Sequence, residues 1–168
     1  MTTKKTSAKR SPPTAAAAST DATSLLMRDH AEVKALFKQY QKLADAEAEG
    51  SERQALAERI CEMLTVHATI EEEIFYPAAR EAEVERDLLD EAEVEHASAK
   101  DLIAQIQSMG PDDGLYDAKV AVLGEYIDHH VQEEEGEMFP RCREAGMDLS
   151  GLAAALAERK DELTTERA

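Results

Sequence analysis

Two stretches of the sequence repeat one pattern around a histidine. In residues 67–77 and again in residues 130–140, a glutamate follows the histidine by four positions and a proline follows it by ten. An aromatic residue stands directly before each proline. Residues four apart lie on the same face of an α-helix. Each stretch therefore predicts a helix that presents an imidazole and a carboxylate from one face.

A second repeated pattern precedes the first one in each half of the chain. Residues 29–37 and 95–103 both begin with an acid, a histidine and an alanine, and a lysine and a leucine follow the histidine by four and six positions. These histidines precede those of the first pattern by 37 and 34 residues. The folded part therefore consists of two copies of one helical hairpin.

The composition and the breaks in the sequence favour helices throughout. Glycine and proline together make up only 12 of 168 residues, whereas 43% are hydrophobic, which argues against a turn-rich β-fold. Gly50 and residues 110–114 interrupt the amphipathic pattern. We expect helices over residues 24–48, 51–80, 84–109 and 115–139, and a shorter one over 151–163. This predicts an all-α fold, an antiparallel up-down-up-down four-helix bundle with a short extra C-terminal helix that packs across one end.

The first 20 residues differ from the rest of the chain, since they hold four basic residues, no acid and a Pro12-Pro13 pair. We divide the chain into a disordered basic tail (1–20), the bundle (21–145), and a short C-terminal helix and tail (146–168). Without the tail, 15 basic residues face 36 acidic ones. This excess of acidic residues outside the tail excludes non-specific nucleic-acid binding by the folded part. We expect at most a weak nucleic-acid contact through the tail.

Each of the four long predicted helices has one histidine on its apolar stripe, and two of them add a glutamate one turn later. Polar groups on a core face are costly when they stay unpaired. A shared metal ion removes this cost. The candidate metal ligands are His30, His67, Glu71, His96, His130 and Glu134.

The donor types indicate the metal. Imidazole and carboxylate without thiolate suit iron or manganese better than structural zinc. Six such ligands are too many for one reactive metal, whereas two metals can share them with the carboxylates as bridges. We expect two non-haem iron ions as cofactors, with manganese or zinc as the weaker alternatives.

His129 competes with His130, because His129 and Glu133 also stand four apart. The repeat decides between them. Pro140 follows His130 by ten positions, as Pro77 follows His67, and His130 continues the apolar stripe of its helix. We therefore expect His130 to face the core and His129 to be exposed or to lie beside the site.

The paired motifs resemble those of the hemerythrin-like (HHE cation-binding) domains over residues 24–143. The resemblance implies the same four-helix bundle. It also implies the ligands of two iron ions: His30 and His67 for one, His96 and His130 for the other, and Glu71 and Glu134 as bridges.

The chain departs from the oxygen-carrying hemerythrins at two positions. Lys100 stands where they have a second histidine one turn after the ligand of the third helix. Their bridging aspartate follows the last histidine by five residues, whereas Glu134 follows His130 by four. One iron therefore lacks a nitrogen ligand, and a water, Glu93 or a tyrosine is left to fill its place. We expect Lys100 to extend away from the site and Tyr76 to pack at the bundle end.

The leading hypothesis is a non-haem di-iron protein that binds or senses oxygen or a related small ligand, such as nitric oxide or peroxide. One alternative is a di-iron enzyme that acts on peroxide or nitric oxide. Another is an interaction bundle with a purely structural metal. No apolar run approaches the roughly 18 residues of a membrane helix. Two cysteines without CxxC spacing favour a reducing cytoplasm.

Overall fold

A computed structural model describes residues 21–167, so the predicted disordered tail (1–20) lies outside the described residues. The described part contains helices and no strand. None of these helices combines the length and apolar character of a membrane span. The elements are α1 (Ala22–Asp45), α2 (Gly50–Ile70), η1 (Glu71–Phe75), α3 (Tyr76–Glu81), α4 (Arg86–Gln107), α5 (Tyr116–Glu133), η2 (Glu134–Met138), α6 (Phe139–Glu144) and α7 (Leu149–Arg167).

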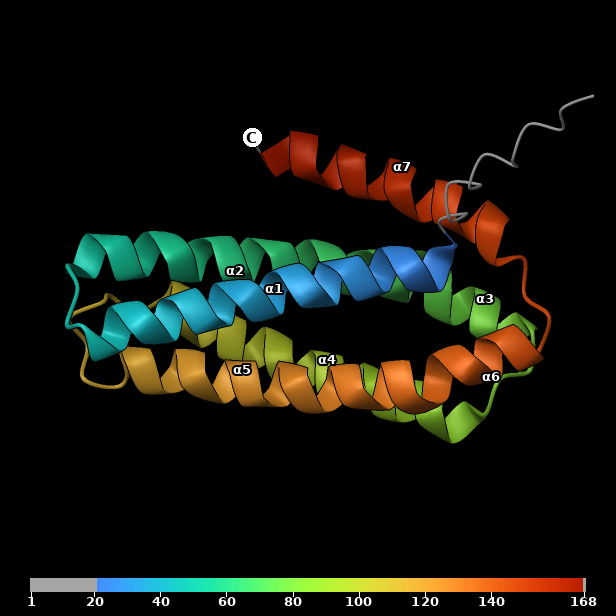
Figure 1. Cartoon of the computed structure of the whole chain (residues 1–168), viewed down its shortest axis with the longest axis horizontal. Helices are drawn as coiled ribbons and strands as arrows, with labels where there is room; N and C mark the ends of the chain where they lie inside the picture. Colours follow the sequence, from blue (N-terminus) through green and yellow to red (C-terminus); the bar gives the residue numbers. More distant parts are fainter. Residues whose placement is uncertain (1–20, 168) are drawn as a thin grey trace, which may run out of the picture.

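The long helices α1, α2, α4 and α5 form the bundle (Figure 1). α1 contacts α2 and α5, and α4 contacts the same two helices, so the four form a closed ring around one core. Short connections make consecutive helices antiparallel neighbours. The predicted all-α, up-down-up-down bundle with an additional C-terminal helix is confirmed.

Two π-helical turns interrupt the long helices, and each begins at the glutamate four residues after a repeat histidine. In η1 the Tyr76 amide donates to the Glu71 carbonyl, and in η2 the Phe139 amide donates to the Glu134 carbonyl, five residues back in each case. The repeated prolines follow directly. A proline donates no hydrogen bond and its ring crowds the carbonyl four residues earlier, which a wider turn relieves. The helical path therefore ends at Glu81, one residue from the expected end at 80, and at Glu144, which lies beyond the expected end at 139.

The C-terminal helix α7 is longer than residues 151–163 and lies along the side of the bundle (Figure 1). It packs on α1, α2 and η1 and does not cross an end of the bundle. Its buried residues, Leu149, Ala153 and Leu156, follow one another at helical spacing. This stripe requires a partner that runs lengthwise, which explains the difference from the expectation.

The core consists of two apolar clusters with a polar layer between them. One cluster contains Leu26, Phe75 and Phe139, and the other contains Val33 and Leu123. The four histidines of the apolar stripes lie between these clusters along their helices. Apolar packing on both sides of the polar layer therefore stabilises the bundle.

Candidate metal centre

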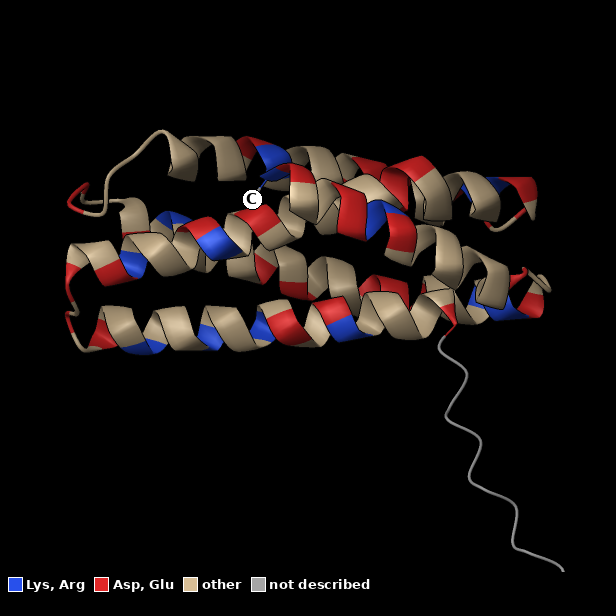
Figure 2. Cartoon of the chain, turned by 90° about the horizontal axis from the view of Figure 1, so that it is seen from above, with Lys and Arg blue, Asp and Glu red and all other residues tan. Residues whose placement is uncertain are grey.

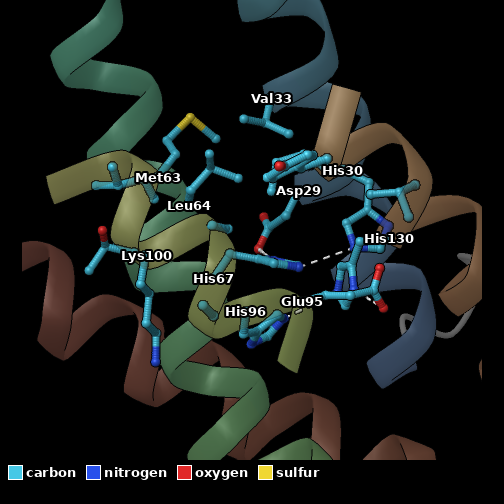
Figure 3. Close-up of a pocket in the computed structure, with 17 residues that line it drawn as sticks. Asp29, His30, Val33, Met63, Leu64, His67, Glu95, His96, Lys100 and His130 are labelled. Atoms are coloured by element: carbon cyan, nitrogen blue, oxygen red, sulfur yellow. Dashed lines mark hydrogen bonds and ion pairs between the residues drawn. The ribbon is translucent and has the colours of Figure 1, made fainter. Parts of the chain in front are cut away.

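The four histidines on the apolar stripes meet in the bundle interior as two pairs (Figure 3). The Nε2 atoms of His30 on α1 and His67 on α2 are 3.1 Å apart. The Nε2 atoms of His96 on α4 and His130 on α5 are also 3.1 Å apart. Each hairpin of the repeat therefore contributes one pair. All four imidazoles are buried or nearly so.

Two buried glutamates link these pairs. Glu71 Oε1 lies 2.5 Å from His67 Nε2 and 3.9 Å from His96 Nε2. Glu134 Oε1 lies 2.7 Å from His130 Nε2 and 3.6 Å from His30 Nε2. Each carboxylate thus reaches one imidazole of its own helix and one of the other pair.

Every imidazole also contacts an outer carboxylate through its second nitrogen. The Nδ1 distances are 3.0 Å for His30 to Glu135, 3.0 Å for His67 to Asp29, 3.3 Å for His96 to Glu72 and 3.4 Å for His130 to Glu95. An N–H at Nδ1 leaves the Nε2 lone pair for the interior. Such carboxylate–histidine pairs are typical of protein metal sites.

These outer carboxylates are functional residues that the helical stripes did not single out. A signal for them was present in the repeat, because an acid directly precedes His30 and His96 and another directly follows Glu71 and Glu134. The helical period alone does not say which carboxylate reaches which imidazole.

The inner groups have the chemistry of a cation site. Both carboxylate oxygens of Glu71 and Oε1 of Glu134 are buried, and the nearest groups that could neutralise them are the imidazole nitrogens of His67 and His130. Buried anionic oxygens need a cation or a proton beside them, because they are costly without one. If two ligand atoms each lie about 2.1 Å from one ion and their bonds enclose a right angle at the ion, the two atoms are about 3 Å apart. The Nε2–Nε2 distance within each histidine pair matches this spacing. The inner residues therefore fit metal cations.

The pKa values of two imidazoles show how strongly the inner groups attract positive charge. Burial opposes protonation of His67, but Glu71 and Asp29 outweigh it and raise its pKa to about 10. Burial opposes protonation of His130 too, yet Glu134 and Glu95 raise its pKa to about 11. In the metal-free protein these protons partly neutralise the buried carboxylates.

Tyr76 belongs to the centre and does not merely pack at the bundle end as the sequence suggests. Its hydroxyl lies 3.1 Å and 3.4 Å from the Nε2 atoms of His96 and His130, and it donates to Glu134 Oε2 at 3.2 Å. Burial and the carboxylates of Glu71 and Glu134 hold the pKa of Tyr76 well above its ordinary value. The π-turn η1 rotates the chain between His67 and Tyr76, so a helical period of 3.6 residues misplaces this side chain.

The repeat places Phe139 where the other half has Tyr76. The Phe139 ring stacks on the His30 ring with centroids 6.0 Å apart and an interplanar angle of 4°. One histidine pair thus has a phenol beside it, and the other has an apolar ring. The two halves of the centre are chemically unequal.

The remaining predicted neighbours lie away from the inner groups. His129 is 68% exposed and pairs with Glu133 on the outer surface at 3.1 Å. Glu93 pairs with Arg80 at 3.0 Å. Lys100 extends outward as expected, and its Nζ lies 2.5 Å from Glu72 Oε1.

A small cavity of about 40 Å³ adjoins both histidine pairs. Its wall is mostly apolar, and it includes Val33, Met63 and Leu64, which Figure 3 shows beside the imidazoles. One water needs about 10–15 Å³ on this measure. The cavity therefore holds only a very small molecule.

Comparison with known proteins decides the family. Residues 21–142 match the model of the hemerythrin HHE cation binding domain. The chain belongs to this family. The predicted resemblance is thus confirmed, and the His and Glu groups of this hemerythrin HHE domain fit a family of cation-binding proteins.

Two individual proteins are also similar to this HHE domain. A crystal structure of a hemerythrin HHE cation binding domain-containing protein from Mycobacterium kansasii has a TM-score of 0.72 and 24% identity, and the match covers 87% of this chain and 88% of that one. A DNA nickase of Nostoc sp. is 30% identical over 119 residues, which cover 71% of this chain and 32% of the nickase. The chain thus spans about a third of the length of that relative.

Proposed function

We propose that the protein is a non-haem di-iron protein that binds or senses oxygen or a related small molecule. One observation carries the proposal: four imidazole Nε2 atoms and two buried carboxylates converge, while each Nδ1 contacts an outer carboxylate. His30 and His67 would hold one iron, His96 and His130 the other, and Glu71 and Glu134 would bridge them. Iron in such a site supplies a redox-active, Lewis-acidic centre.

The cavity beside the histidines supports a diatomic or similarly small ligand such as oxygen, nitric oxide or peroxide. Its volume of about 40 Å³ suits a molecule of a few atoms better than a large organic substrate. Its apolar lining suits a poorly hydrated molecule. Cys61 and Cys142 are free thiols, which fits a reducing cytoplasm as the setting.

A second candidate function is that of a di-iron enzyme acting on peroxide or nitric oxide, and the Tyr76 hydroxyl is the observation that favours it. Reduction of peroxide to water, or of nitric oxide to nitrous oxide, takes up two protons together with two electrons from an external electron donor. Tyr76 keeps its proton inside the bundle and donates it to Glu134, next to one histidine pair. The described helices carry more acidic than basic residues (Figure 2), which does not favour binding of nucleic acid by the bundle.

The test is metal analysis of protein loaded with ferrous iron under anaerobic conditions. We expect two iron ions per chain, and an optical spectrum that changes when nitric oxide is added. A single iron per chain would refute the dinuclear centre. If the protein binds two metals but its spectrum does not respond to nitric oxide, azide or peroxide, the metals have a purely structural role. Consumption of added peroxide by the iron-loaded protein separates the enzyme from the binding protein.

A further inference from the structure

Lys160 of helix α7 forms an ion pair with Asp29, the outer carboxylate that contacts His67. Lys160 Nζ lies 2.5 Å from Asp29 Oδ1, and the other oxygen of this carboxylate, Oδ2, lies 3.0 Å from His67 Nδ1. The Asp29 side chain is only 8% exposed, so solvent screens this ion pair weakly. Figure 3 shows Asp29 directly beside His67. The three groups form one line from α7 to the interior.

The chemistry of this line is directional. A hydrogen bond from Nδ1–H to a free carboxylate makes the imidazole a stronger electron donor at Nε2. An ammonium on the same carboxylate draws electron density from it and so withdraws part of that effect. We infer that Lys160 is a positioning residue that acts through Asp29: it weakens the hydrogen bond that Asp29 accepts from His67 Nδ1–H and thereby favours the reduced state of the metal bound by His30 and His67. This inference rests on the proposed di-iron function.

The other half of the repeat offers an internal comparison. The counterpart of Asp29 is Glu95, which contacts His130 Nδ1 at 3.4 Å. Its second oxygen lies 4.0 Å from the exposed His129 and has no lysine on it. Helix α7 packs mainly on α1, α2 and η1, which all belong to the first half of the repeat, and the sequence has no second copy of this helix. The lysine therefore distinguishes one half of the centre from the other.

Two other cations of the chain serve as controls. Arg159, next to Lys160 on α7, binds Glu73. Glu73 is not one of the four outer carboxylates that contact the imidazoles. Arg159→Gln thus weakens the docking of α7 and leaves the Asp29–His67 contact in place. Lys100 binds Glu72, which contacts His96 Nδ1 at 3.3 Å but is 31% exposed. Lys100→Gln should therefore show a smaller effect of the same sign.

The first measurement uses the metal-free protein, so it does not depend on iron. The proton resonance of the His67 Nδ1–H should move downfield in Lys160→Gln and in Lys160→Met, because Asp29 becomes a stronger acceptor. It should keep its position in Lys160→Arg and in Arg159→Gln. Circular dichroism checks that α7 remains helical. An unmoved resonance in Lys160→Gln, or an equal shift in Arg159→Gln, would overturn the inference.

The second measurement is a redox titration of the iron-loaded variants, followed by absorption. Loss of a residue that hydrogen-bonds a metal ligand typically lowers metal affinity or activity 10–100-fold. Lys160 lies one hydrogen bond further from the metal than such a residue, so its effect should lie at the lower end of this range. We expect Lys160→Gln to raise the ferric-to-ferrous ratio about tenfold at a fixed potential, a downward shift of about 59 mV for one electron. Lys160→Arg should restore the wild-type potential. A potential equal to that of wild type in Lys160→Gln refutes the inference, whereas failure of the wild type to load iron refutes the proposed function and leaves the first measurement to decide.

Discussion

His129 and His130 are neighbours in the sequence but lie in opposite environments. The His130 side chain is 6% exposed and faces Glu134, whereas that of His129 is 68% exposed and faces Glu133. Consecutive helical residues point about 100° apart, so only one of the two can face the interior. We expect His130→Ala to lose at least one metal per chain and His129→Ala to keep the full content. Metal analysis of the two purified variants checks this, and the reverse pattern would place the metal on the outer surface.

Protonation of His67 and His130 predicts how metal binding depends on pH. Their pKa values in the metal-free protein are about 10 and about 11, so both imidazoles carry protons at pH 7. A metal requires neutral imidazole and must displace these protons. Loading at pH 7 should release about two protons per chain, and affinity should rise from pH 6 to pH 8. Calorimetry in buffers of different ionisation enthalpy measures the release, and uptake without it would contradict the assignment.

The same raised pKa values set the pH dependence of stability in the metal-free protein. A group with a raised pKa in the folded state stabilises that state fully below its ordinary pKa of 6.5 and loses this contribution as pH rises through the folded value. Metal-free protein should therefore lose stability between about pH 7 and pH 10. Chemical denaturation across this range measures it. The metal-loaded protein should lack this loss, because its imidazoles are already neutral.

At the level of the helices, two C-terminal turns place a glutamate in the left-handed backbone region, which is unfavourable for a residue with a side chain. After α3, the Val84 amide bonds the Ala79 carbonyl and the Glu83 amide bonds the Arg80 carbonyl, which is the Schellman arrangement. It places Glu83 at a φ of 61°, and α1 ends in the same way at Glu47 with a φ of 50°. Glycine is the usual residue there, as at Gly146.

Replacing this glutamate should therefore stabilise the protein. Glu83→Gly removes the left-handed strain and an anion at a helix C-terminus, and we expect a gain of about 1 kcal/mol. Glu91→Gly, on the exposed face in the middle of α4, is the matched control and should cost about 1 kcal/mol. Thermal unfolding should show shifts of about 2–4 °C in opposite directions. A loss of stability in Glu83→Gly would mean that glutamate makes an interaction that offsets its backbone strain.

On the scale of the whole molecule, the two apolar clusters predict a bundle that stays folded without metal. The polar layer lies between them, and each cluster joins residues from several helices. Removing the metal with a chelator should leave the helical circular dichroism unchanged. The melting temperature should fall, since a ligand at 100 times its Kd contributes about 2.7 kcal/mol. Loss of the helical signal on chelation would show that the metal is required for folding.

The fold and the six inner residues could be predicted from the sequence for one physical reason. A helix has a fixed period, so an apolar stripe determines which residues face the interior, and His130 was separated from His129 in this way. The internal repeat added that two equal hairpins face each other. Local spacing was sufficient here because the four histidines lie on regular α-helix, and Glu71 and Glu134 are the first residues of the π-turns, where the helical path has not yet shifted.

The other contacts of the site could not be predicted, because they join residues whose relative positions the helical period does not determine. Tyr76 reaches His96 and His130 only because a π-turn shifts the face of the chain after Glu71. The pairing of Asp29 with His67 joins two different helices. Lys160 reaches Asp29 across 131 positions because α7 lies along the bundle. Interior-facing residues follow from the geometry of one helix, whereas the partners of their second nitrogens follow only from how the helices pack against one another.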